Sequence, residues 1–178
     1  MKKRMIITGS GGQGVVMLSV LLANAYGIYE GYEVAQTQSY GAQARGGASQ
    51  SSLVISDSPI DYIEVDKADV FVAFNEMGFK KYFPKCHSET KIFVDSTFID
   101  PSLYKDLPNP VYEINATYIA EHQFKPVMVN VVMMGFIVAK LGEIKLESLQ
   151  KTIASELPAK AYEQNIAALK VGYERGIT

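Results

Sequence analysis

Short apolar runs alternate with longer helical patterns along the chain. Segments of strand length with apolar or alternating character occur at 4–8, 33–38, 50–56, 69–74, 91–95 and 111–114. Helical patterns begin near Gly14, cover 76–83, and fill the C-terminal third at 127–141, 146–157 and 158–175. The run at 69–74 is apolar almost throughout, which is typical of a parallel strand covered on both faces. Strands that alternate with helices predict an α/β fold with a doubly wound, mostly parallel sheet and a helical C-terminal third.

Two helical segments are apolar nearly all round, at 15–29 and at 127–141. A helix without a polar face is buried on every side, either in the core of its own chain or against a partner. We expect some of this surface to meet another chain, and we therefore expect a homodimer when the chain is made alone.

Length and composition narrow the class of protein. With 178 residues, 48% apolar and 20% charged, the chain fits one globular domain over 1–178, and its bulk is not disordered. The 17 basic and 19 acidic residues leave a net charge of −2, so the basic excess of a nucleic-acid binder is missing. No apolar run reaches membrane-spanning length, and the first one is too short for a signal peptide. We expect a cytoplasmic protein.

The cysteine and histidine content argues against a metal centre in this chain. Cys86 is the single cysteine, so neither a disulfide framework nor a thiolate iron–sulfur or zinc site can be built here. His87 follows it directly, but neighbouring side chains of an extended segment point to opposite sides, which disfavours a catalytic pair. The acidic residues that follow position 56 fit a solvated face better than a metal site; they are Asp57, Asp61, Glu64, Asp66 and Asp69.

A glycine-rich turn lies between the first predicted strand and the first helix. It contains Gly9, Gly11, Gly12, Gln13 and Gly14 and satisfies the pattern G-x-G-x-x-G. Such a turn lets the backbone approach a phosphate, and the helix N-terminus attracts anions. The turn is therefore either a tight connection without a ligand or a site for an anionic group.

Two nucleotide-binding variants of this turn are disfavoured. An NAD site needs an acid at the end of the second strand, but that strand ends in 36–38 (Gln-Thr-Gln), and Glu33 stands at its beginning. A Walker A loop is excluded because no Gly-Lys-Ser/Thr follows.

A second loop after the second strand, 39–47, carries the other candidate residues: Ser39, Tyr40, Arg45, Gly46 and Gly47. Arg45 is the only cation between Arg4 and Lys67. In a doubly wound fold this loop borders the glycine turn across the strand ends. Arg45 then either forms an ion pair with an acidic residue of a neighbouring chain or makes a bidentate contact with a phosphate or carboxylate.

The two loops together resemble a known family. Gly11-Gly12-Gln13-Gly14-Val15, Ser39-Tyr40-Gly41 and Ala44-Arg45-Gly46-Gly47 are similar to the gamma subunits of 2-oxoacid:ferredoxin oxidoreductases, and the likeness spans the whole chain. Further matching positions are Asn75, Val94-Asp95-Ser96, Asn130 and Asn165. The short gamma subunits of 2-oxoglutarate (2-oxoglutarate synthase) and branched-chain enzymes are most similar. Residues 41–43 (Gly-Ala-Gln) replace the commoner Gly-Pro-Glu.

The resemblance implies a subunit of an enzyme that oxidatively decarboxylates a 2-oxoacid to its acyl-CoA and reduces ferredoxin. Thiamine diphosphate with Mg²⁺ and the iron–sulfur clusters then belong to companion alpha, beta and possibly delta chains. This chain contributes no catalytic residue; it completes the assembly and flanks the cavity where coenzyme A enters. Its two loops bind coenzyme A or another anion, or they form a subunit interface.

Two alternatives stay open from sequence alone. One is the smaller subunit of an indolepyruvate:ferredoxin oxidoreductase, which shares the same domain. The other is a stand-alone nucleotide-binding module, which would bind ATP, NAD or flavin by itself.

Overall fold

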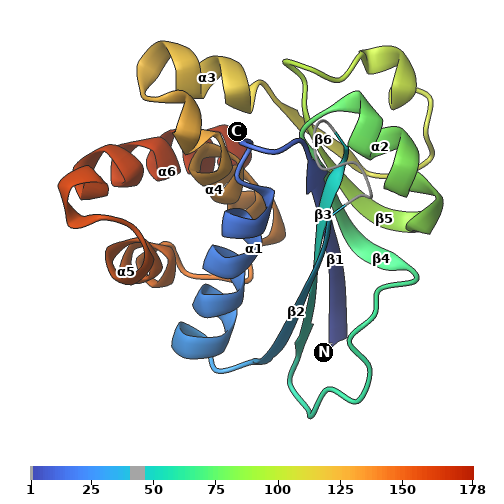
Figure 1. The fold of residues 1–178 in the computed structure, drawn as a ribbon, viewed down its shortest axis with the longest axis horizontal. Helices are drawn as coiled ribbons and strands as arrows, with labels where there is room; N and C mark the ends of the chain where they lie inside the picture. The colour runs from blue at the N-terminus through green and yellow to red at the C-terminus, as the bar shows by residue number, and fades with distance from the viewer. Residues whose placement is uncertain (1, 41–46) are drawn as a thin grey trace.

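One six-stranded sheet forms the centre of the computed structural model, which describes residues 2–40 and 47–178 (Figure 1). The strands lie in the order β2-β3-β1-β4-β5-β6. Their bounds are β1 Lys2–Gly9, β2 Glu33–Tyr40, β3 Ser49–Ser56, β4 Ala68–Ala73, β5 Cys86–Asp95 and β6 Val111–Ile114. The strands β1, β4, β5 and β6 are parallel neighbours, whereas β3 is antiparallel to both β1 and β2. The predicted α/β class with a mostly parallel sheet is confirmed.

The position of β3 departs from strict alternation of strands and helices. β2 and β3 are consecutive strands that pair with each other, and Tyr40 lies opposite Ser49. The eight residues between them, 41–48, are fewer than the dozen or more that a parallel crossover needs, which fits their antiparallel pairing. On its other side β3 pairs with β1, where Ser49 lies opposite Gly9. The end of β1, the end of β2 and the start of β3 therefore share one edge of the sheet.

Six α-helices accompany the sheet. Their bounds are α1 Val15–Asn24, α2 Glu76–Tyr82, α3 Ala116–Gln123, α4 Val129–Leu141, α5 Leu146–Glu156 and α6 Tyr162–Ile177. A π-helical turn, Ala25–Tyr29, continues α1, and one-turn 3₁₀ segments lie at Phe83–Lys85, Pro101–Leu103, Pro126–Met128 and Ala159–Ala161. Five of these α-helices match predicted segments, and α3 was not predicted.

The helices cover the two faces of the sheet unequally. In Figure 1, α1 and α3 to α6 lie on one side of the strands and α2 lies on the other. The side chains of β1 alternate accordingly, because Met5 and Ile7 join the core under α1 and α4 while Ile6 joins the core under α2. Both faces of β4 are buried in the same way, as its apolar run predicts.

The helix α4 is buried by its own chain. All residues from Val129 to Val138 are buried against the sheet and the surrounding helices. Most of the apolar segment 127–141 is thus covered within its own chain, but Val127, just before α4, is 68% exposed. In the segment 15–29, Met17 and Ile28 are 40% and 65% exposed. The expectation that some surface of these two segments meets another chain stays a prediction.

Glycines allow α4 and α6 to touch backbone to backbone. A Cβ atom at Gly172 would lie 1.9 Å from the carbonyl oxygen of Val132, and one at Gly135 would lie 2.2 Å from that of Leu169. Any larger residue would force the two helices apart.

Two glutamates connect the first and last thirds of the chain. Glu143 forms an ion pair with Lys3 and accepts a hydrogen bond from the hydroxyl of Tyr26 at 2.9 Å. Burial, followed by the nearby Glu143 carboxylate, raises the pKa of Tyr26. Glu30 accepts from the backbone N–H of Lys145 at 3.0 Å and from Ser148 Oγ at 2.7 Å.

Within the described ranges, no helix has both the length and the apolar character that crossing a membrane requires.

Candidate functional site

The glycine turn lies where β1 ends and α1 begins, as the sequence predicts. Gly12 and Gly14 have φ angles of +91° and +72°, a left-handed conformation that side-chain-bearing residues rarely adopt. Gly14 directly precedes the first turn of α1. Added Cβ atoms at Gly11 and Gly12 would meet nothing within 4 Å, so the tip of the turn is open to a ligand or a partner.

Side chains from two strand ends hold this turn in place. Gln13 Oε1 accepts from the backbone N–H of Ser10 at 2.7 Å, and Gln13 Nε2 donates to the Phe74 carbonyl at 3.3 Å. Asn75, which follows β4, donates to Ser10 Oγ and to Gln13 Oε1. Its own Oδ1 accepts from Gly78 N at 2.8 Å and so caps α2. One asparagine thus couples the glycine turn to the start of a helix on the opposite face.

This junction is the point at which the sheet reverses its winding. The chain leaves β1 toward α1 on one face and leaves the adjacent β4 toward α2 on the other. Open α/β sheets bind ligands in the crevice outside such a point. A crevice of about 530 Å³ lies there, lined by Ser10, Gln13, Asn75, Glu76, Met77 and Phe98. Met77 and Phe98 are 46% and 51% exposed, which gives the crevice an apolar rim.

The second loop begins and ends at the same edge. Ser39 and Tyr40 close β2, and Gly47 stands two residues before β3. Ser49 Oγ donates to the Gly9 carbonyl at 3.0 Å, which ties the start of β3 to the glycine turn. The described ends of the second loop thus lie at the same edge of the sheet as the glycine turn. Arg45 and Gly46 lie outside the described residues.

The geometry also explains why an NAD site is disfavoured. Glu33 pairs with Ser56, and Ser56 pairs with Lys2, so Glu33 lies at the edge opposite the glycine turn. The strand beside β1 on this side is the antiparallel β3 rather than a parallel second strand. Among the described residues, the end of β2 therefore presents no carboxylate to an NAD ribose.

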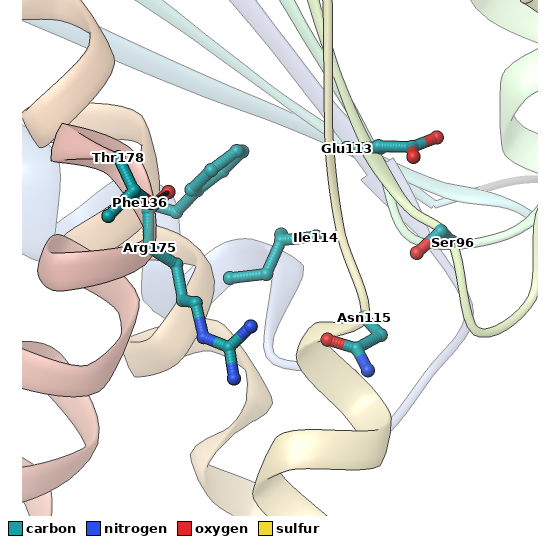
Figure 2. A pocket seen from close by; sticks show the side chains of 7 residues that line it. All are labelled: Ser96, Glu113, Ile114, Asn115, Phe136, Arg175 and Thr178. Carbon is teal, nitrogen blue, oxygen red and sulfur yellow. Dashed lines mark hydrogen bonds between the residues drawn. The ribbon is translucent and has the colours of Figure 1, made fainter.

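A polar hollow that the sequence did not reveal lies at the ends of β5 and β6. It has a volume of about 350 Å³, and Ser96, Glu113, Asn115, Phe136 and Arg175 contribute to its lining. Figure 2 shows Arg175 extending from α6 toward Asn115 at the start of α3. Across the hollow, Glu113 accepts a hydrogen bond from the Tyr104 hydroxyl at 2.6 Å. Because Arg175 lies about 60 residues after the end of β6 in the sequence, spacing gives no sign of this hollow.

The other titratable residues that the sequence singled out are either buried within the fold or exposed on the surface, outside the crevice. Asp95 is fully buried at the end of β5 and accepts from Thr97 N, Thr117 N and Thr117 Oγ1 at 3.1, 3.0 and 2.6 Å. Burial raises the pKa of Cys86 to about 12, so its thiol stays protonated at neutral pH. Of the acidic residues after position 56, Asp57, Asp61, Glu64 and Asp66 are exposed, as expected for a solvated face.

Comparison with known proteins identifies the family. The sequence profile of pyruvate ferredoxin/flavodoxin oxidoreductases matches residues 4–175. The 2-oxoglutarate synthase subunit KorC of Methanocaldococcus jannaschii is 35% identical over 98% of this chain and 94% of its own length. This chain belongs to the pyruvate ferredoxin/flavodoxin oxidoreductase family. The resemblance read from the two loops is confirmed, and the chain is an oxidoreductase subunit.

Other members of the family are more distant in sequence but share the fold. The indolepyruvate oxidoreductase subunit IorB of Archaeoglobus fulgidus is 25% identical over 100% of this chain and 97% of its own length. The keto/oxoacid ferredoxin oxidoreductase gamma subunit of Geobacter sulfurreducens superposes with a TM-score of 0.86 at 29% identity, covering 99% of this chain and 97% of that one.

A larger chain contains the same fold. The 2-oxoglutarate:ferredoxin oxidoreductase of Magnetococcus marinus, solved with 2-oxoglutarate, coenzyme A and succinyl-CoA bound, also gives a TM-score of 0.86. This chain covers 31% of that longer one at 20% identity, a level at which the likeness shows the fold alone.

Proposed function

We propose that this chain is the gamma subunit of a 2-oxoglutarate:ferredoxin oxidoreductase. Such an enzyme converts 2-oxoglutarate and coenzyme A to succinyl-CoA and CO₂, and the two electrons released reduce two ferredoxins. The end-to-end match to the 2-oxoglutarate synthase subunit KorC carries the proposal, since it reaches 35% identity against 25% for the indolepyruvate subunit.

The redox and carbon chemistry of this reaction belongs to companion chains. Thiamine diphosphate with Mg²⁺ and iron–sulfur clusters would supply it, but the residues of this chain do not fit those groups. Cys86 is its single cysteine, and the described residues hold no group of three His, Cys, Asp or Glu side chains that could bind a metal ion. No catalytic step is therefore assigned to this chain.

In the complex, the edge of the sheet that carries the glycine turn is the part of this chain that contacts a ligand or a companion chain. The open tip at Gly11 and Gly12, the crevice beside it and the described ends of the loop 39–47 share this edge. Backbone N–H groups at the turn and the cation of Arg45 suit the phosphates of coenzyme A or an acidic patch of a companion chain.

The assembled complex tests the assignment of the substrate. We expect the tagged chain, purified from its native source, to bring with it companions that bind thiamine diphosphate and iron–sulfur clusters. The complex should oxidise 2-oxoglutarate with coenzyme A at a higher kcat/KM than pyruvate, 2-oxoisovalerate or indolepyruvate. The chain alone should show no turnover with any electron acceptor. Preference for indolepyruvate, or turnover by the chain alone, contradicts the proposal.

A matched pair of glycine variants tests the role of the turn. Gly12 and Gly31 both have positive φ angles, +91° and +78°, and open space around them, but Gly31 lies near the start of β2 at the opposite edge. Gly12→Leu and Gly31→Leu should lose similar stability, about 1–2 kcal/mol. Only Gly12→Leu should also raise the KM for coenzyme A or release companion chains, measured by steady-state kinetics and gel filtration of the complex. Equal behaviour of the two variants in both measurements excludes a role for the turn.

A further inference from the structure

The strand β2 forms one border of the six-stranded sheet, and the side that it turns away from β3 is called its outer side below. All eight residues of β2 pair with β3 in one unbroken register. In the part of the chain that the structure describes, no strand pairs with the outer side. A border strand of this length offers a row of main-chain groups with which another strand can pair.

One hydrogen bond shows which main-chain groups of β2 face outward. Ser51 Oγ, on β3, donates to the carbonyl of Thr37 at 3.1 Å, so the main-chain groups of Thr37 face β3. Residues along a strand direct these groups to alternate sides, so those of Val34 and Gln36 face outward. Within residues 2–40 and 47–178, no group pairs with the main-chain N–H or C=O of Val34 and Gln36.

The strand β2 lacks the features that protect border strands against pairing with other chains. Lysine, proline, bulges and short length are the usual protection. Residues 33–40 contain neither lysine nor proline, Glu33 is their only charged residue, and the ladder with β3 has no bulge. The opposite border, β6, has only four residues, with Pro110 directly before it and Glu113 within it. One border of the sheet is therefore protected and the other is open.

We propose that the outer side of β2 pairs antiparallel with β2 of a second copy of this chain. The twofold axis passes beside Gln36, so that Gln36 faces Gln36 of the second copy and Glu33 faces Ser39. The sequence fits this arrangement, because the charged end of each strand meets a neutral one and no like charges oppose each other. Ile28 adds exposed apolar surface beside the contact, since its π-helical turn packs against Val34 through Gly27.

Two variants of Gln36 test the role of its main-chain N–H. Gln36→Pro removes this N–H but spares the ladder with β3, because the group faces outward. Gln36→Ala removes the same side chain, with its hydrogen bond to Ser51, but keeps the N–H. In sedimentation of the isolated full-length chain at tens of micromolar, wild type and Gln36→Ala should dimerise. Gln36→Pro should weaken the dimer at least about tenfold, and circular dichroism checks that it is folded.

Engineered cysteines test the register and do not depend on the proline variant. In a Cys86→Ser background, Gln36→Cys places two thiols opposite each other, with Cα atoms about 5.5 Å apart, which suits a disulfide. Thr37→Cys is the matched control on the same strand, because its two Cα atoms would lie more than about 7 Å apart. With oxidised glutathione as the oxidant, we expect a linked dimer from Gln36→Cys and not from Thr37→Cys.

Three outcomes overturn the proposal. The first is a monomeric wild-type chain at tens of micromolar, which would leave β2 to a strand of a companion chain. The second is equal dimerisation of Gln36→Pro and Gln36→Ala, and the third is a yield of linked dimer from Thr37→Cys that equals or exceeds that from Gln36→Cys. Each experiment measures association of the chain with itself, so failure of the oxidoreductase assignment would leave these results unaffected.

Discussion

Glu30 is the residue through which the first third of the chain fixes the start of α5. Lys145 precedes that helix, and its side chain forms no capping hydrogen bond. The carboxylate of Glu30 takes over this function by accepting from Lys145 N and Ser148 Oγ. Burial alone would raise the pKa of Glu30, but these hydrogen bonds lower it below its ordinary value.

Removal of this charge should give a pH-dependent loss of stability. A carboxylate with a depressed pKa stabilises the fold above the pKa of the unfolded state, about 4.3, and this stabilisation disappears as the pH falls through the lower folded-state value. We expect Glu30→Gln to be less stable than wild type by about 0.5–1 kcal/mol at pH 7, and this difference should shrink as the pH falls below about 4.3. Urea unfolding from pH 3 to 7 measures the difference. Glu121→Gln, at an exposed glutamate of α3, is the control and should show no such trend.

At the scale of elements, the contact between α4 and α6 depends on glycine. Gly172→Ala should lower the free energy of unfolding by at least about 3 kcal/mol, because its Cβ would lie 1.9 Å from the Val132 carbonyl oxygen and neither backbone can give way. Gly27→Ala is the matched control, since its Cβ would meet Val34 at 3.5 Å, an ordinary contact. It should change stability by less than about 1 kcal/mol. Similar losses for both variants in urea unfolding would show that the two helices can move apart freely.

The elements differ in how far the sequence reveals them. The buried strand β4 and the helix α4 follow from continuous apolar runs, because complete burial leaves a pattern that needs no knowledge of the neighbours. The helix α3 was missed because its eight residues, ATYIAEHQ, mix apolar and polar positions over only two turns. The insertion of β3 between β1 and β2 depends on pairing between distant segments, which the local pattern does not contain.

The same distinction applies to the site. The glycine turn is local in sequence, and its strand–turn–helix setting follows from the pattern G-x-G-x-x-G. A cavity of about 330 Å³ behind the turn is lined by Gly14, Asn130 and Asn165, residues that only the packing of α1, α4 and α6 brings together. An asparagine in an apolar helix is the one signal in the sequence that points to it.

At the scale of the molecule, the edge that carries the glycine turn also carries exposed apolar side chains. Met17, Met77, Phe98, Tyr118 and Val127 are each at least 40% exposed. The first four lie near the end of a strand or the start of the helix that follows it, and Val127 lines a cavity together with Gly14 and Met17. Such a patch is typical of a surface that another chain covers. The homodimer expected for the isolated chain stays a prediction, and the exposed side chains of the two apolar segments, Met17, Ile28 and Val127, are consistent with it.

Variants of Arg45 in the complete enzyme show whether this edge binds a ligand or contacts a companion chain. If its guanidinium binds coenzyme A or the substrate carboxylate, Arg45→Ala should raise the corresponding KM at least about tenfold while the complex stays assembled. Arg45→Lys should restore part of this loss, because an ammonium cannot make the planar two-pronged contact. If Arg45 pairs with a companion chain, Arg45→Ala should instead dissociate the complex at moderate salt. Unchanged kinetics and an unchanged elution profile would assign Arg45 neither role.

The burial of α4 within its own chain has a consequence for the assembly of the enzyme and for the exchange of its subunits. Because the apolar helix α4 is already covered within the chain, we expect this subunit to fold without waiting for its companions. It can also leave the complex without unfolding. We therefore expect a labelled copy of this chain to exchange into the preassembled enzyme, at a rate set by dissociation of the interface rather than by refolding.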